Sequence, residues 1–150
     1  MKKKEGFTLL EILISLGILG ALFAGILIFL NPFSYFQKSR NNERTAHAHA
    51  LLNAITTKKI DAKGEFLCGA GEIPATSTRI RSEVGGYDAL PCLYPIYLLR
   101  VPKDPNGAGV YYTSTSSYDL GYDVWKNGVT GRIIIEAPFA EDGEVISASR

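Results

Sequence analysis

The sequence predicts an α+β fold in which one long N-terminal helix packs on a small antiparallel sheet of three to four strands. Three observations lead to this prediction. Residues 7–30 are almost entirely apolar, residues 31–63 carry a helical hydrophobic pattern, and short β-branched and aromatic segments follow residue 106. A chain of 150 residues has room for one domain with an appendage.

Composition narrows the possible classes of function. Charged residues make up 21% of the chain and hydrophobic residues 46%, which is typical of a globular protein and not of a disordered one. The net charge of +1 provides no strong basic field, so nucleic-acid binding is not expected. Two cysteines are too few for a disulfide-dense mini-protein or a four-cysteine zinc site.

The apolar run 7–30 has the length of a membrane-spanning helix. Its 24 residues would extend about 36 Å, against a hydrocarbon core of about 30 Å. Three lysines precede it, and the positive-inside rule then keeps the N-terminus in the cytoplasm. A cleaved secretory signal has a shorter apolar region and small residues at its cleavage site. This run is too long for such a signal and has no small residues at the required positions. A plain signal anchor is the simpler alternative.

Glu11 is the unusual residue of this segment. The only other polar side chains in the run belong to Thr8 and Ser15. A carboxylate inside a membrane helix costs about 2.5–3.5 kcal/mol near the centre and less near an end. No lysine, arginine or histidine lies within residues 7–30, so the partner of Glu11 must be a cation from another chain or a newly made amine.

The N-terminus resembles the class III signal of type IV pilins and type II secretion pseudopilins. The likeness rests on a basic leader (residues 1–6) that ends at Gly6, followed by Phe7, Thr8 and Glu11 in register with the spanning run. The resemblance implies a pilin-like fold, cleavage between Gly6 and Phe7, and N-methylation of Phe7. It also implies that Glu11 neutralises the N-terminal amine of a neighbouring subunit during assembly.

The same resemblance implies partners and a location. The helix 7–30 would first span the inner membrane and then form a filament core, outside the cytoplasm or at the cell surface. The partners would be a prepilin peptidase and methyltransferase, other copies of the chain, minor pilin-like subunits, and an inner-membrane assembly platform with a separate ATPase. Removing the leader leaves 144 of the 150 residues and a net charge of −1. The alternative is a single-pass anchored extracytoplasmic binding protein that does not polymerise, and it has no use for Glu11.

Residues 31–63 are expected to form the amphipathic second half of the long helix. Pro32 predicts a kink or a local break after which the helix resumes, the alternative being that it ends the membrane helix. The stripe of Ala48, Leu51, Leu52, Ile55 and Ile60 would face the core, and Gly64 would cap the C-terminus. Residues His47 and His49 are two apart, hence about 200° apart on a helix, so we expect solvated histidines and no shared metal.

The globular head is expected over residues 64–150. Residues 64–105 read as a connecting region, with one short helix near residues 79–90. Cys68 and Cys92 lie in it. On the oxidising side of a membrane they would form a disulfide that stabilises the head by roughly 3 kcal/mol; two buried free thiols are the alternative.

Residues 106–150 should hold the antiparallel sheet. Strands are predicted at 110–113, 118–125 and 132–137, with a last edge strand near 145–147 and a tight turn at Asn127-Gly128. Before them, the segment Pro102-Lys103-Asp104-Pro105 resembles a Pro-x-Asp-Pro segment of major pseudopilins and is interpreted as structural.

No enzyme or cofactor site is predicted. The sequence lacks nucleotide-binding, nucleophile-elbow and zinc-protease motifs, and both histidines lie on one helix. Major pseudopilins bind Ca²⁺ in a loop after this sheet region, and the oxygen ligands here would be Asp119, Asp123 and Asn127. These residues lie on a strand and a turn instead of an acid-rich loop, so no metal is expected.

Overall fold

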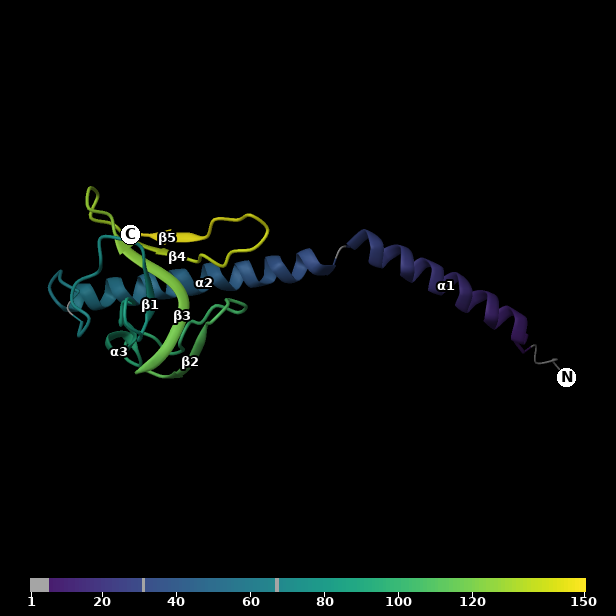
Figure 1. Cartoon of the computed structure of the whole chain (residues 1–150). Coiled ribbons are helices and arrows are strands. Elements are labelled where there is room, and N and C mark those ends of the chain that lie inside the picture. The colour runs from purple at the N-terminus through teal and green to yellow at the C-terminus, as the bar shows by residue number, and fades with distance from the viewer. Residues whose placement is uncertain (1–5, 31, 67) are drawn as a thin grey trace. The chain divides into compact units, whose positions relative to one another are not determined.

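The computed structural model describes residues 6–30, 32–66 and 68–150 and divides the chain into two compact units, residues 1–36 and 37–150. The first unit contains helix α1 (Leu9–Leu30) and the start of helix α2 (Pro32–Asp61). The remaining elements are β1 (Thr78–Arg81), α3 (Leu90–Leu93), β2 (Tyr111–Ser114), β3 (Ser117–Lys126), β4 (Ile133–Glu136) and β5 (Ser147–Ser149) (Figure 1). The predicted α+β class is confirmed.

The long predicted helix is built as two helices. Pro32 is the first residue of α2, a position that suits proline because the first helical N–H needs no partner within the helix. Helical structure is therefore present on both sides of Asn31, which lies outside the described residues, and the kink or local break stays a prediction.

The C-terminus of α2 differs in one detail from the predicted cap. Lys63, not Gly64, takes the first left-handed position, with φ of 58°, and its N–H donates to the Ile60 carbonyl at 3.1 Å. Gly64 follows with φ of 106° and donates to the Lys59 carbonyl at 2.8 Å. This pair of bonds is the Schellman arrangement, which satisfies two carbonyls that the helix end leaves open.

The sheet is built around β3. Asp119 of β3 pairs with β1 and with β2, while Val124 pairs with β1 and with β4. Because a strand has only two edges, β1 occupies one edge of β3, and β2 and β4 share the other edge end to end. Strand β5 pairs with β4, and every pairing is antiparallel.

Strand β1 corrects the sequence-based expectation. Residues 78–81 were expected in a connecting region with a short helix, but they form a fifth strand against β3, which raises the count above the three to four predicted. The short helix lies further on, at Leu90–Leu93. The Asn127-Gly128 signal also does not make a two-residue turn: β3 and β4 are joined by residues 127–132, closed by the Asn127 N–H donating to the Arg132 carbonyl at 2.8 Å.

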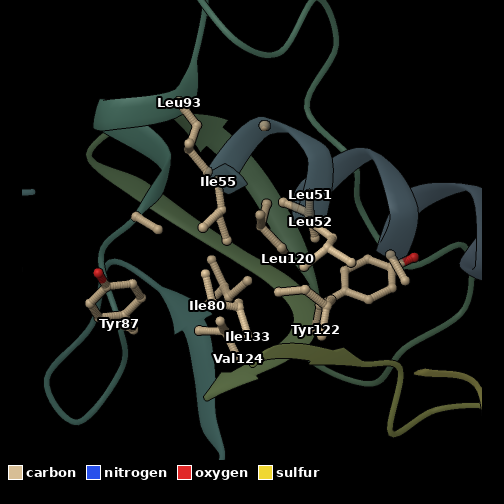
Figure 2. Packing of buried hydrophobic residues seen from close by; sticks show 14 of the residues in the cluster. Leu51, Leu52, Ile55, Ile80, Tyr87, Leu93, Leu120, Tyr122, Val124 and Ile133 are labelled. Atoms are coloured by element: carbon tan, nitrogen blue, oxygen red, sulfur yellow. The ribbon is translucent and has the colours of Figure 1, made fainter. Parts of the chain in front are cut away.

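The core lies between the later part of α2 and the sheet (Figure 2). The predicted alternation along β3 is confirmed, because one face of the strand is fully buried: Tyr118, Leu120, Tyr122 and Val124. Against it α2 contributes Ala48, Leu51, Leu52 and Ile55, as its periodicity predicted. Ile60, in the last turn of α2, is instead 70% exposed.

Candidate processing and assembly site

Helix α1 has no packing partner within the described chain. Every large apolar side chain from Phe7 to Phe29 is at least 51% exposed. The stretch Leu9–Phe29 is 21 residues long and apolar enough to cross a membrane. A soluble monomer rarely leaves so large an apolar surface in water, so the helix requires lipid or other protein around it.

The three polar side chains of the apolar run are not equivalent. Thr8 precedes the helix and caps it, its Oγ1 accepting the Glu11 N–H at 3.3 Å. Ser15 donates its hydroxyl to the Glu11 carbonyl at 2.8 Å. The backbone of the helix thus satisfies both hydroxyls, whereas none of the ion pairs among the described residues includes Glu11.

The glycines of α1 also indicate that this helix requires lipid or other protein around it. A side chain added at Gly17 or Gly20 would meet no atom within 4 Å in the described chain. Each glycine within a helix costs about 1 kcal/mol relative to alanine. No contact with the described residues offsets that cost, but close packing against a neighbouring helix would.

The predicted cleavage position precedes α1. Gly6 and Phe7 have no regular secondary structure, both are exposed, and α1 begins at Leu9. A side chain at Gly6 would also meet nothing within 4 Å, so the fold does not require glycine there. An exposed, non-helical segment is what a protease can bind in extended form.

The head contains a buried ionic cluster that the sequence did not reveal. Arg44 is only 1% exposed and binds the fully buried Asp104 through two bonds, Nε to Oδ2 at 2.8 Å and Nη2 to Oδ1 at 3.1 Å. Its Nη1 donates to Glu141 Oε2 at 2.9 Å, and Arg40 Nε donates to the same oxygen at 2.6 Å. These Arg40 and Arg44 bonds lower the pKa of Glu141 from 4.5 to about 2.

This cluster joins three segments of the head. Asn41, also buried, donates to the Glu141 carbonyl at 2.8 Å and accepts the Glu141 N–H at 3.0 Å. Asp104 Oδ1 also accepts the Asn106 N–H at 2.9 Å, so the Pro102–Pro105 segment has the structural role that was predicted. Helix α2, that segment and the 141–144 loop are therefore held by one network. Arg40 and Arg44 of α2 lie at its centre.

The candidate calcium ligands do not gather around a cation site. Asp119 and Asp123 both face Arg79, whose Nε lies 3.9 Å and 3.4 Å from one oxygen of each. Asn127 Oδ1 accepts two backbone N–H groups of its own loop at 2.9 Å each. Within the described ranges no group of three or more acidic, histidine or cysteine side chains is placed to hold a metal.

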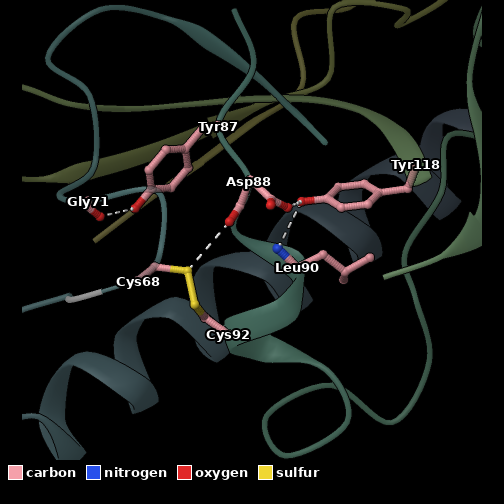
Figure 3. Close-up of a disulfide and its surroundings, with 7 residues drawn as sticks. All are labelled: Cys68, Gly71, Tyr87, Asp88, Leu90, Cys92 and Tyr118. Atoms are coloured by element: carbon pink, nitrogen blue, oxygen red, sulfur yellow. Dashed lines mark hydrogen bonds between the residues drawn. A yellow bond between two sulfur atoms is a disulfide. The ribbon is translucent and has the colours of Figure 1, made fainter. Parts of the chain in front are cut away.

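The two cysteines form a disulfide, one of the two alternatives left open by the sequence (Figure 3). Their Cα atoms are 5.9 Å apart, and Cys92 lies in α3. At the start of α3, the Tyr118 hydroxyl donates to Asp88 Oδ1 at 2.6 Å and accepts the Leu90 N–H at 3.1 Å. The disulfide therefore joins two parts of the connecting region to each other, and the Tyr118 hydroxyl fixes that region to β3.

The two histidines differ from each other. His49 is exposed, as predicted. His47 is half-buried, with Nδ1 3.0 Å from the Tyr122 hydroxyl, so the expectation of a solvated side chain was wrong for this residue. Burial lowers the pKa of His47 and favours the neutral ring, which is suited to a hydrogen bond with a tyrosine.

Comparison with known proteins bears on the N-terminus. The prokaryotic N-terminal methylation motif matches residues 1–27, so the chain carries the class III signal of type IV pilin-like proteins. Comparison with curated proteins and with solved structures found no significant match. The matched range includes Gly6, Phe7 and Glu11 and ends within α1.

Proposed function

We propose that the chain is a structural subunit, not an enzyme, of a type IV pilus or a type II secretion pseudopilus. It is cut between Gly6 and Phe7, N-methylated at Phe7, and polymerised through α1. One observation carries the proposal: within the matched motif, Glu11 is a carboxylate without an ion-pair partner among the described residues, on an exposed apolar helix.

Charge pairing explains why cleavage and assembly would be linked. Cleavage releases an ammonium at Phe7, four residues and about one helical turn from Glu11. Two opposite charges placed together in an apolar environment recover much of the desolvation free energy that each would lose alone. Because the partner amine belongs most usefully to a neighbouring copy, the pair would set the register between subunits.

The exposed apolar surface of α1 suits both the membrane stage and the filament stage of assembly. In the membrane its apolar side chains contact lipid, and in a filament they contact the helices of neighbouring copies. The environment remains apolar in both states, so extraction from the bilayer does not expose the helix to water in its final state. Gly17 and Gly20 would let neighbouring helices approach closely.

Several partners follow from this proposal. A prepilin peptidase and methyltransferase would remove residues 1–6, and an inner-membrane platform with a separate ATPase would extract the mature chain. Other copies and minor pilin-like subunits would complete the filament. The chain would begin as a single-pass inner-membrane protein with its N-terminus in the cytoplasm, in agreement with three lysines before the span.

The test is the mass of the mature chain. Intact-mass measurement with N-terminal peptide mapping, on protein from the native membrane or cell surface, should show a chain that begins at Phe7 and carries one extra methyl group. A chain that begins at Met1 would contradict the proposal and favour the anchored, non-polymerising binding protein. Gly6→Val should block the cut, whereas Gly69→Val, at another glycine with open space around it, should not.

A further inference from the structure

Three aromatic side chains at the start of α2 have no place in the core of the head. Phe33, Tyr35 and Phe36 are 65%, 63% and 63% exposed, and none belongs to the buried cluster. Single exposed apolar residues are common on protein surfaces. Three aromatic residues within four positions are a concentration of apolar surface that indicates a partner.

Their distribution around the helix favours a surrounding medium over a single protein face. Phe33 and Phe36 are about 60° apart on the helix, and Tyr35 is about 160° from Phe33, at 3.6 residues per turn. A helix that docks on one partner usually presents an apolar stripe about 100° wide. These three rings, which we call the collar, instead lie within an arc of about 160°, which is wider than such a stripe.

Their position along the chain corresponds to the boundary of a membrane. The span Leu9–Phe29 has 21 residues and a length of about 31 Å, close to the hydrocarbon thickness of about 30 Å. Phe33 follows Phe29 by four residues. The headgroup layer on each side is about 5–8 Å thick. At about 1.5 Å per residue, Phe33 and Phe36 follow Phe29 by about 6 Å and about 10.5 Å. Helical side chains point back toward the N-terminus, so the three rings reach this layer.

The chemistry of the collar suits that layer. Aromatic rings, and tyrosine above all, favour the membrane interface because one end of the side chain is apolar and the other can bind water. The charged residues Lys38 and Arg40 begin two positions after Phe36. The order along the chain is therefore apolar span, aromatic collar and then charge.

We propose that Phe33, Tyr35 and Phe36 form an interfacial collar that docks in the phospholipid headgroup layer and fixes the depth of the unassembled chain in the membrane. The inference rests on the membrane stage of the proposed function. It identifies the residues that hold the subunit before assembly and that must leave the lipid when the subunit is extracted.

Fluorescence depth measurement tests the collar on the full-length chain. Trp125 is the only tryptophan, so Trp125→Phe provides a silent background for a single Phe36→Trp probe. The protein is reconstituted in vesicles of phosphatidylglycerol and phosphatidylcholine brominated either near the headgroup or near the bilayer centre. The Phe36→Trp probe should be quenched more strongly by bromine near the headgroup.

Two control probes test the collar separately from the membrane-spanning position of α1, on which the collar depends. Leu19→Trp, at the middle of Leu9–Phe29, should be quenched best by bromine near the centre. Val129→Trp, at a head residue that is 96% exposed, should be quenched by neither lipid. If Phe36→Trp behaves like Val129→Trp while Leu19→Trp is quenched, the span stands and the collar is wrong. If Leu19→Trp is not quenched either, α1 does not lie in the bilayer, and both the proposed membrane position and the collar are wrong.

A second measurement distinguishes lipid from another copy of the chain. If neighbouring copies cover the collar, lipid will not quench Phe36→Trp, and its shielding from aqueous iodide will increase with the protein-to-lipid ratio; that result would overturn the proposal. Replacing Phe33, Tyr35 and Phe36 together by serine should weaken the deep quenching of Leu19→Trp, because the span loses its depth marker. Unchanged quenching would remove the depth-setting role.

Discussion

The two long helices of this chain meet the same physical requirement in opposite ways. Leu51 and Ile55 of α2 are completely buried against the sheet, whereas Leu19 and Leu22 of α1 are more than half exposed. Both helices must remove apolar surface from water. Helix α2 finds its apolar partner inside the chain, and α1 finds none among the described residues. The comparison shows which helix is built for folding and which is built for contact with something else.

A second contrast involves charge. Arg44 is buried and has two carboxylate partners, Asp104 and Glu141, supplied by distant parts of the chain. Glu11 lies in an apolar helix and has none among the described residues. Buried or membrane charges need partners. Among the described residues, the buried arginine of the head has its counter-charges within the chain, and the acid of the N-terminal helix does not.

Glu11→Gln should have the largest effect, the loss of filament assembly, while the head keeps its stability. Glutamine preserves the shape of the side chain but cannot neutralise an ammonium. Filament yield would be measured by shearing cells and blotting the released fraction, with thermal unfolding of the full chain as the stability readout. Glu65→Ala, which removes an exposed acid from the head, is the control. Normal filaments from Glu11→Gln would contradict the pairing account.

Arg44→Met should destabilise the head by about 3–5 kcal/mol, the range expected when one partner of a buried ion pair is removed. The loss arises because Asp104 stays buried without a cation. Urea unfolding of the purified chain in detergent would measure it. Arg132→Met, at an exposed arginine, should change the unfolding free energy little. A small loss at Arg44 would mean that water can enter and solvate Asp104.

A leucine-to-alanine substitution in each helix compares how much the two helices contribute to the stability of the head. Leu51→Ala should lower the unfolding free energy of the head by about 2–5 kcal/mol, because it leaves a cavity in the core. Leu22→Ala, at a side chain that is 59% exposed, should leave head unfolding unchanged. Denaturant unfolding of both variants is the measurement. Equal losses would show that Leu22 contributes as much as Leu51 to the stability of the head, which would contradict the different roles assigned to the two helices.

Acid should weaken the ionic cluster, and this is the smallest predicted effect. The folded-state pKa of Glu141 is lowered to about 2 from 4.5, so its contribution is complete above 4.5 and is lost as the pH falls toward 2. The side chain is 20% exposed, which allows solvent to screen its interactions with the arginines. Urea midpoints of the wild type at about pH 5 and about pH 3 should differ more than those of Glu141→Gln.

Much of the fold follows from local patterns. The apolar run fixes α1, the helical stripe predicts the buried face of α2, and the alternation from Tyr118 to Val124 predicts which side of β3 faces the core. The N-terminal motif identifies the candidate processing site because its residues lie close together in sequence. In each case the information needed is contained within one segment.

The features that the sequence did not predict depend on contacts between segments that lie far apart along the chain. Strand β1 has the sequence Thr-Arg-Ile-Arg, with one apolar residue, and it becomes a strand because β3 offers it a free edge. Arg44 and Asp104 are 60 residues apart, and no local sequence pattern indicates that they form an ion pair. The same holds for His47 and Tyr122, separated by 75 residues.

The bridge between Cys68 and Cys92 has a consequence for the timing of maturation. Disulfides persist in oxidising compartments and are rare in the cytosol. A chain inserted with its N-terminus in the cytoplasm would close this bridge only after the head has crossed the membrane. The oxidation state of the two thiols would therefore record, chain by chain, whether translocation is complete, and a thiol-reactive mass label would separate new chains from translocated ones without any substitution.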